Sequence, residues 1–297
     1  MENLIITNNK FNYKDFKTRY FEFIDVTEKT RRTYLDGINS FIQYIKMNNI
    51  VNPTREDIIS WRDSLKENHS SSTVNTYLVG LKSFFSYLDI VRLYPNITKN
   101  VKGAKTTITP KKNILSLEQV QFIYKNLNNN RDKALFSLLI TTGLRGIEVA
   151  NAKIEDIKKF NNENVLYVKC KGHSEKDEYV KLADNVYQDL KKYIKDRKEG
   201  YIFISTSKNN FGQGITTKSI RCIIKNIYKQ FGLENANMSL HSTRRSSACI
   251  SYNLGASIYD IQQVLHHVSI TTTSRYIKNA ERNTNDTELK VAKAMLG

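Results

Sequence analysis

The stretch LHHVSITTTSRYIK, residues 265–278, places two adjacent histidines ahead of a single tyrosine, with His267 nine residues before Tyr276. The residues just before this stretch have the spacing of an amphipathic helix, so His267 falls where that helix ends. Three interpretations are open for the pattern: the side chains pack in a core, bind a metal ion or take part in chemistry. The rest of the chain has to decide among them.

The charge of the chain points to an anionic partner. The 297 residues include 46 Lys and Arg against 29 Asp and Glu, which gives a formal net charge of +17. An excess of this size is self-repulsive unless a polyanion neutralises it, and nucleic acid is the leading candidate. A basic protein without a specific partner is the alternative that charge alone leaves open.

Several classes of protein are disfavoured by what the chain lacks. It contains no run of about 18 apolar residues, which a membrane-spanning helix needs. The N-terminal residues lack a basic region followed by an apolar core, so we expect no signal peptide. Cys170, Cys222 and Cys249 show no metal-binding spacing and fit a reducing compartment. We therefore expect a cytoplasmic protein that does not contact a membrane.

Residues 1–100 are expected to form a small helical bundle. Within residues 30–47, apolar side chains recur every three or four positions, as on one face of a helix. The same spacing recurs in residues 54–65 and 71–88, so three or four helices joined by short loops are predicted. Residues 101–113 are polar, basic and without helical spacing, and we interpret them as an interdomain linker.

Residues 114–297 are expected to form a larger second domain. SLEQ at 116–119 is a capping box that starts a helix. Two segments, 165–169 and 178–182, have strand character and flank a polar turn. Helical spacing dominates the remainder and returns in the tail at 285–297. The predicted fold is mainly α with a small antiparallel sheet, an α+β arrangement of an N-terminal helical bundle and a larger C-terminal domain.

The common catalytic motifs are missing, which leaves a spaced set of basic residues. The chain lacks the P-loop GxxxxGK[ST], the GxSxG turn and the HExxH zinc motif. Arg145 lies in the largely apolar stretch TGLRGIE and should have a definite partner, for which an ion pair with Glu148 is favoured locally. His241 and Arg244 are one helical turn apart and can face the same point, although a charged helix start explains them equally well.

Four motifs follow one another in a fixed order along the second domain. They are TGLRGIEVA at 142–150, the Lys171–Gly172 pair in the strand turn, HSTRR at 241–245 and LHHVSITTTSRY at 265–276. Together they resemble the tyrosine recombinase (phage integrase) family, which includes Xer-like and Cre-like enzymes. Each motif alone is unspecific, whereas their order and spacing are specific, and the resemblance runs from about residue 13 to near the C-terminus.

Two positions depart from the family pattern. His266 stands at a helix end where a glycine is common, and we interpret it as incidental to the site. Ile147 stands before Glu148 where a small hydroxyl residue is common. Neither departure removes a residue that matches the site. Position by position, the resemblance implies six site residues: Arg145, Lys171, His241, Arg244, His267 and Tyr276.

The resemblance implies site-specific DNA recombination through a covalent intermediate. Tyr276 would attack a DNA phosphodiester and give a 3′-phosphotyrosine and a free 5′-hydroxyl. The transition state carries negative charge, which two arginines can bind without a metal ion or other cofactor. The implied roles are phosphate binding for Arg145 and Arg244, proton donation to the leaving oxygen for Lys171, proton acceptance for His241, and phosphate contact or orientation of the tyrosine for His267.

The resemblance also implies an assembly on double-stranded DNA that carries recombination sites. The N-terminal core-binding domain and the C-terminal catalytic domain would clamp the duplex, with the C-terminal helix packed on its own domain or on a neighbour. Protomers that are monomeric when free would form a homo-tetramer and exchange strands through a four-way junction, with a DNA-bending or directionality factor as an accessory. Because helical spacing begins near residue 13, we expect no further DNA-binding domain before it, and a simple recombinase acting on short paired sites.

Three alternatives compete with this interpretation. A non-catalytic DNA-binding relative would have no chemical need for all six matching residues. A type IB topoisomerase would use the same tyrosine chemistry for strand relaxation, and a small N-terminal module without large insertions favours the recombinase. A metal site made of His173, His266 and His267 is the weakest, because adjacent histidines on a helix point about 100° apart. Whether the reaction serves integration or excision of a mobile element or dimer resolution is left open.

Overall fold

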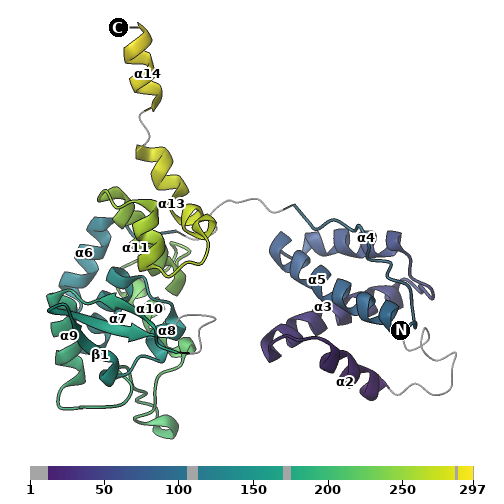
Figure 1. The fold of residues 1–297 in the computed structure, drawn as a ribbon, viewed down its shortest axis with the longest axis horizontal. Helices are drawn as coiled ribbons and strands as arrows, with labels where there is room; N and C mark the ends of the chain where they lie inside the picture. The colour runs from purple at the N-terminus through teal and green to yellow at the C-terminus, as the bar shows by residue number, and fades with distance from the viewer. Residues whose placement is uncertain (1–12, 106–112, 170–174, 285–286, 297) are drawn as a thin grey trace. The chain divides into compact units, whose positions relative to one another are not determined.

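The computed structural model describes residues 13–105, 113–169, 175–284 and 287–296. It divides into two compact units, unit 1 (residues 1–108) and unit 2 (residues 109–297), which we treat separately. Both units are mostly helical, and the strands lie in unit 2 (Figure 1). The predicted class, mainly α with a small antiparallel sheet, is confirmed.

Unit 1 is a bundle of helices around one apolar core. Phe41 of α3 packs against Phe85 of α5 and against the fully buried Trp61 of α4. Polar caps start the helices where the sequence predicts them, as at Thr54, whose backbone N–H donates to Asp57 Oδ2 at 2.7 Å. The elements are α2 (Tyr13–Phe23), α3 (Glu28–Met47), α4 (Arg55–Ser64), the 3₁₀ turn η1 (Leu65–Glu67) and α5 (Ser71–Ile90).

Helices α3 and α5 cross so closely that only glycine fits at the crossing. A Cβ atom at Gly37 would lie 2.6 Å from the carbonyl oxygen of Tyr77. A Cβ atom at Gly80 would lie 2.7 Å from Cα of Tyr34. Because each glycine admits the backbone of the opposite helix, the two helices pack in close contact.

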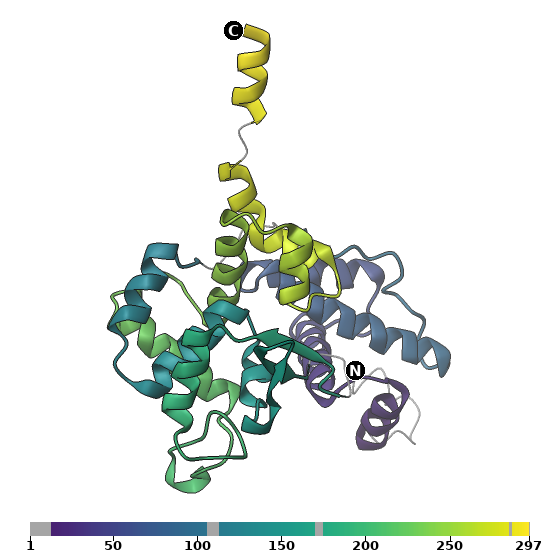
Figure 2. The same cartoon turned by 60° about the vertical axis from the view of Figure 1, so that its left-hand side comes forward.

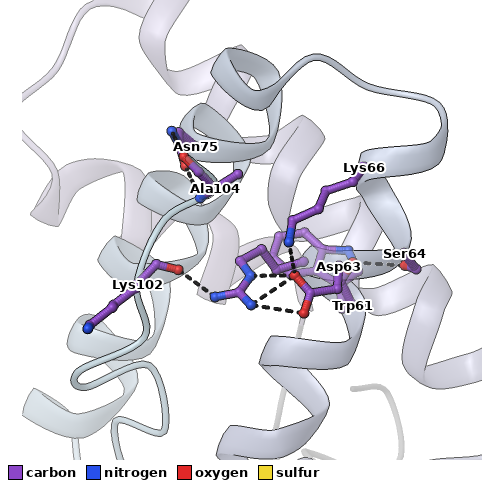
Figure 3. A network of polar contacts seen from close by, with 8 residues as sticks. Trp61, Asp63, Ser64, Lys66, Asn75, Lys102 and Ala104 are labelled. Atoms are coloured by element: carbon purple, nitrogen blue, oxygen red, sulfur yellow. Dashed lines mark hydrogen bonds and ion pairs between the residues drawn. The ribbon is translucent and has the colours of Figure 1, made fainter. Parts of the chain in front are cut away.

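The chain leaving α5 is held to unit 1 by side chains that bind its backbone (Figure 3). Arg62 Nη1 donates to the carbonyl oxygen of Lys102 at 2.7 Å. Asn75 accepts from the N–H of Ala104 at 2.7 Å and donates to its carbonyl oxygen at 3.0 Å. Residues 102–104, at the start of the expected linker, are therefore fixed to α4 and α5, while residues 106–112 lie outside the described residues.

Unit 2 is built around α7 (Asn130–Thr142), whose residues from Ala134 to Ile140 are all buried. It packs against α9, α10 and α11 (Figure 1). A helix buried on all sides is apolar all round, which explains why this segment lacks an amphipathic pattern. The other elements are α6 (Leu117–Asn126), α8 (Gly146–Ala150), η2 (Ile154–Asp156), α9 (Asp184–Ile194), η3 (Lys208–Asn210), α10 (Thr217–Gln230), α11 (Leu240–Asn253), α12 (Ile258–Val264), α13 (Ile270–Thr284) and α14 (Thr287–Leu296).

One antiparallel sheet of three strands, in the order β1-β2-β3, lies on unit 2. It consists of β1 (Ile157–Phe160), β2 (Glu163–Val168) and β3 (Glu178–Lys181). The sequence predicted β2 and β3 but not β1, because three of the four β1 residues are exposed and no apolar alternation marks the strand. The turn between β1 and β2 is Asn161–Asn162 with φ of 49° and 64°, the conformation of a two-residue type I′ hairpin.

None of the helices in the described part of the chain is long and apolar enough to cross a membrane.

Candidate active site

Helix α11 carries two of the expected site residues and lies beside α13, which carries a third (Figures 1 and 2). His241 is the second residue of α11, and Arg244 follows one turn later. The helix is anchored by Ser246, whose hydroxyl oxygen accepts from the backbone N–H of Leu115 at 2.7 Å. The buried side of α11 carries several polar side chains, namely Ser242, Thr243, Arg244, Ser246 and Ser247.

Arg244 is only 1% exposed and joins three segments of unit 2. Its Nη1 donates to the carbonyl oxygen of Gly143 at 2.6 Å, and its Nη2 donates to the carbonyl oxygen of Leu265. Its Nε is buried without a hydrogen-bond partner among the described residues. Burial and the charge of Arg145 lower the pKa of Arg244, which remains charged because a guanidinium starts from a very high pKa.

Gly143 is required by the backbone at this point. It ends α7 in the left-handed conformation, with φ of 63°. A Cβ atom there would lie 2.4 Å from Cδ2 of Leu265. Glycine thus allows the chain to turn sharply and present its carbonyl oxygen to Arg244.

Arg145 is the N-cap residue of α8 and forms the ion pair with Glu148 that the sequence favoured. Its Nη1 lies 2.7 Å from Oε1 of Glu148, and its backbone N–H donates to Oε2 at 2.6 Å. The Glu148 side chain is fully buried, whereas the Arg145 side chain is 27% exposed. The charge of Arg145 also contributes to lowering the pKa of His241, Arg244 and His267. The ion pair and a role in the site are therefore compatible.

Tyr276 and His241 are in direct contact. The hydroxyl oxygen of Tyr276 lies 2.6 Å from Nε2 of His241, and the two rings meet edge to face. The backbone of Tyr276 is fixed from behind, because Cys249 Sγ donates to its carbonyl oxygen at 3.1 Å and Ile277 is fully buried. Partial burial of the His241 ring, together with the positive charges of Arg244, Arg245 and Arg145, lowers the pKa of His241. A neutral imidazole next to a phenol can accept its proton.

The His267 ring also contacts the Tyr276 ring, with ring centroids 5.2 Å apart. It is 6% exposed, and its Nδ1 lies 2.9 Å from the hydroxyl oxygen of Thr273. Gln262 Nε2 donates to the His267 carbonyl oxygen at 2.9 Å. Desolvation, followed by the charges of the two site arginines, lowers the pKa of His267 to about 4. The ring is therefore neutral near pH 7.

His266 adopts the conformation that makes glycine favourable, with φ of 48°. Its side chain is 8% exposed, and its Nε2 lies 3.8 Å from a carboxylate oxygen of Glu178 on β3. Its Nδ1 is buried without a partner among the residues described. A cavity of about 890 Å³ separates β3 from α12 here, and both His266 and His267 line it. His266 thus points toward the sheet, while His267 lies against Tyr276.

The structure brings His241, Arg244, His267 and Tyr276 together and places the charge of Arg145 beside them. Lys171 and His173 lie outside the described residues. Within the described residues no group of three or more His, Cys, Asp or Glu side chains comes together in a way that could hold a metal ion. Sequence reasoning missed Thr273, for which the only signal is its place one turn before Tyr276.

Two family models match the chain. Residues 113–283 match the model described as the Phage integrase family. Residues 15–90 match the model described as Phage integrase, N-terminal SAM-like domain. The first match includes all six residues that the sequence selected, and the second covers the helices of unit 1.

Relatives of similar length and solved structures of similar fold accompany these matches. The chain is 27% identical over 289 residues to tyrosine recombinase XerA from Pyrococcus horikoshii, covering 96% of this chain and 95% of the relative. The XerH site-specific recombinase bound to difH substrate in a pre-cleavage complex has a TM-score of 0.67 at 20% identity, covering 90% of this chain and 79% of that one. A lambda integrase tetramer bound to a Holliday junction has a TM-score of 0.66 at 17% identity, covering 91% of this chain and 81% of that one.

Proposed function

Because this chain belongs to the phage integrase family and is a tyrosine-type site-specific DNA recombinase, we propose that Tyr276 is the residue that cleaves DNA. The observation that carries this proposal is the 2.6 Å contact between the Tyr276 hydroxyl and Nε2 of His241. A tyrosine hydroxyl has an ordinary pKa near 10 and needs a neighbouring base to become a nucleophile. A neutral His241 is such a base.

In the proposed step, the Tyr276 oxygen forms a bond to a DNA phosphorus atom and the bond from that phosphorus to the 5′-oxygen breaks. The phenolic proton passes to His241, and the leaving 5′-oxygen takes a proton from Lys171. The products are a 3′-phosphotyrosine and a free 5′-hydroxyl. Since the covalent link keeps the energy of the broken ester, a 5′-hydroxyl from another strand can reverse the reaction and rejoin the DNA.

Arg145 and Arg244 are proposed to bind the non-bridging phosphate oxygens. Charge builds on these oxygens in the transition state, and fixed guanidinium donors stabilise it without reorganising. Arg244 is already held by two carbonyl oxygens, and its buried Nε is free of a partner among the described residues. A buried donor of this kind costs free energy until a ligand binds it, and a phosphate oxygen is a suitable acceptor.

The substrate is proposed to be duplex DNA with recombination sites, which suits the net charge of +17. XerH, of similar fold, is bound to its difH substrate, and lambda integrase of similar fold forms a tetramer on a Holliday junction. We infer that this chain likewise assembles as a homo-tetramer on two duplexes and exchanges strands through a four-way junction. The reaction would serve integration and excision of a mobile element or dimer resolution, with accessory DNA-bending or directionality factors.

A covalent trapping experiment tests the proposal. Nicked duplexes with randomised core and arm sequences are incubated with the full chain in EDTA, and denaturing gels detect and recover the covalent adduct. We expect an adduct with the natural chain and with Tyr259→Phe, a change at an exposed tyrosine of α12. Tyr276→Phe should form none, and Lys171→Ala should bind the recovered duplex but cleave it more slowly. An adduct formed by Tyr276→Phe, or one abolished by chelation, would overturn the mechanism.

A further inference from the structure

A buried threonine hydroxyl contacts Nδ1 of the His267 ring. Thr273 lies in α13, one turn before Tyr276, and is completely buried. Its hydroxyl oxygen is 2.9 Å from Nδ1 of His267. Because Nδ1 is engaged, Nε2 is the ring nitrogen left for a substrate in the site.

The state of Nε2 depends on which nitrogen carries the single proton of the neutral ring. With its pKa lowered to about 4, His267 has one N–H group near pH 7 and can exist as either of two tautomers. If Nδ1 carries the proton, Nε2 presents a lone pair and repels an anion. If Nε2 carries the proton, the ring donates a hydrogen bond to a phosphate oxygen. The partner of Nδ1 decides between these tautomers.

A hydroxyl differs from the usual partners of a histidine nitrogen. A backbone carbonyl or a carboxylate can only accept, so either would fix the proton on Nδ1. The Thr273 hydroxyl can donate as well as accept, and when it donates, Nδ1 is the acceptor and the single proton lies on Nε2. Gln262 Nε2 donates to the His267 carbonyl oxygen at 2.9 Å, which fixes the backbone that carries the ring.

We propose that Thr273 is a positioning residue that holds His267 as the Nε2–H tautomer, so that the ring donates a hydrogen bond to the DNA phosphate. The proposal rests on the proposed function for the identity of the anion, but the tautomer is a property of the free protein. It therefore has a test that needs no DNA.

The test is the nitrogen chemical shifts of His267 in the full chain labelled with ¹⁵N-histidine, measured near pH 7. The His267 signals are assigned by their loss in His267→Gln. We expect the natural chain to show a protonated Nε2 and an unprotonated Nδ1. Thr273→Val, which keeps the shape of the side chain and removes the hydroxyl, should shift the ring toward a mixture of tautomers, and Thr273→Ser should restore the natural pattern.

The same variants give a second readout in DNA cleavage at saturating duplex. Thr273→Val should slow adduct formation by roughly 10- to 100-fold, the range found when the orienting partner of a functional histidine is lost. Thr273→Ser should recover most of the rate. Thr271→Val is the matched control, because it makes the same substitution at an exposed position of α13. It should change neither the spectrum nor the rate.

The outcomes separate this proposal from the proposed function. A protonated Nδ1 in the natural chain overturns the role of Thr273 whatever the activity, and this result does not depend on whether Thr273→Val folds. An unchanged tautomer in a folded Thr273→Val overturns it as well. If the tautomer behaves as expected and no adduct forms with the natural chain, the tautomer assignment stands and the proposed function fails.

Discussion

The two units of this chain bury different kinds of side chain. Twelve buried polar or charged residues are found in the described part of the chain, and Thr98 is the only one in unit 1. The core of unit 1 is otherwise made of apolar and aromatic groups around Trp61. Seven of the other eleven lie in α11 and in the stretch from His267 to Thr273, around Tyr276: Ser242, Thr243, Arg244, Ser246, Ser247, His267 and Thr273.

This difference distinguishes a core that only holds the fold from an interior that also positions functional groups. Burying a polar group costs free energy unless it finds a partner, so an apolar core is the more economical way to hold a fold. The polar interior beside Tyr276 is a less stable choice that fixes charged and hydrogen-bonding groups in place before substrate arrives. We infer that unit 2 gives up stability at the site and that unit 1 does not.

Arg62 and Arg244 allow the largest expected effect to be measured as a matched pair. Each guanidinium donates to backbone carbonyl oxygens, Arg62 to one and Arg244 to two. Arg244→Lys keeps the charge, but its three N–H donors lie on one nitrogen and cannot reproduce the planar fork that reaches both carbonyls and a phosphate. We expect cleavage at saturating duplex to fall by about 100- to 1000-fold, as when a transition-state donor is removed.

Arg62→Lys should leave the cleavage rate at saturating duplex unchanged and lower the free energy of unfolding by about 1 kcal/mol, the value of one hydrogen bond. Single-turnover cleavage and urea unfolding, measured on both variants, give the comparison. Equal losses of cleavage in the two variants would mean that the carbonyl-binding arginines of both units serve the same purpose, and the contrast between the units would be wrong.

Much of the fold was predictable because it depends on local signals. The helices of unit 1 follow from their apolar spacing, and the capping boxes at Thr54 and Ser116 mark two helix starts. Strand β1 was missed because its side chains are mostly exposed, although Asn161–Asn162 before a strand is a hairpin signal that could have found it. The apolar helix α7 was found by composition alone, since a helix buried all round has no polar face.

The site was only partly predictable because its contacts cross long stretches of sequence. Motif order selected His241 and Tyr276, but the contact between them spans 35 residues and depends on how α11 packs on α13. The unpartnered Nε of Arg244 and the Thr273 hydroxyl on His267 arise from that packing, and no local pattern signals them. The burial of the His266 side chain next to Glu178 of β3 also depends on this packing, and whether His266 is incidental to the site stays a prediction.

The effect of acid should be smaller than that of Arg244→Lys: as pH falls, unit 2 should lose stability before unit 1. His267 has a pKa of about 4 in the folded chain and an ordinary value of 6.5. Between these values the unfolded chain binds a proton that the folded chain does not, so stability is lost as pH falls from 6.5 toward 4, by up to about 1.4 kcal/mol per pH unit. His241 and His266, with pKa values also lowered, act in the same direction.

Unit 1 should lose stability at lower pH. The hydrogen bond from Lys66 and contacts with Arg62 lower the pKa of Asp63 from 3.8, so its contribution is present above that value and is lost below it. Trp61 is the single tryptophan of the chain, and its fluorescence reports unit 1. Urea titrations at pH 7, 6 and 5 should show α11 and α13 losing protection from hydrogen exchange at lower urea as pH falls, while the Trp61 transition moves less. His267→Gln should reduce this shift, and parallel transitions for both units would contradict the prediction.

The smallest expected effect compares two left-handed residues, Asn49 in unit 1 and His266 in unit 2, with φ of 51° and 48°. Asn49 is exposed, so its side chain contributes little besides tolerance of this conformation. At either position the glycine variant should be more stable than the alanine variant by about 1 kcal/mol, because alanine keeps the backbone strain that glycine relieves. Urea unfolding of the four variants measures this difference.

The comparison with the natural residues then isolates what the His266 ring contributes. Asn49→Gly should be neutral or slightly stabilising, since only strain is removed. In His266→Gly, relief of strain and removal of the unpartnered Nδ1 oppose the loss of a buried ring against β3, so the free energy of unfolding should change by less than about 1 kcal/mol. If cleavage at saturating duplex stays normal, His266 only fills space beside the site. If cleavage falls while stability holds, the ring positions β3, and the polar interior around Tyr276 extends to the sheet.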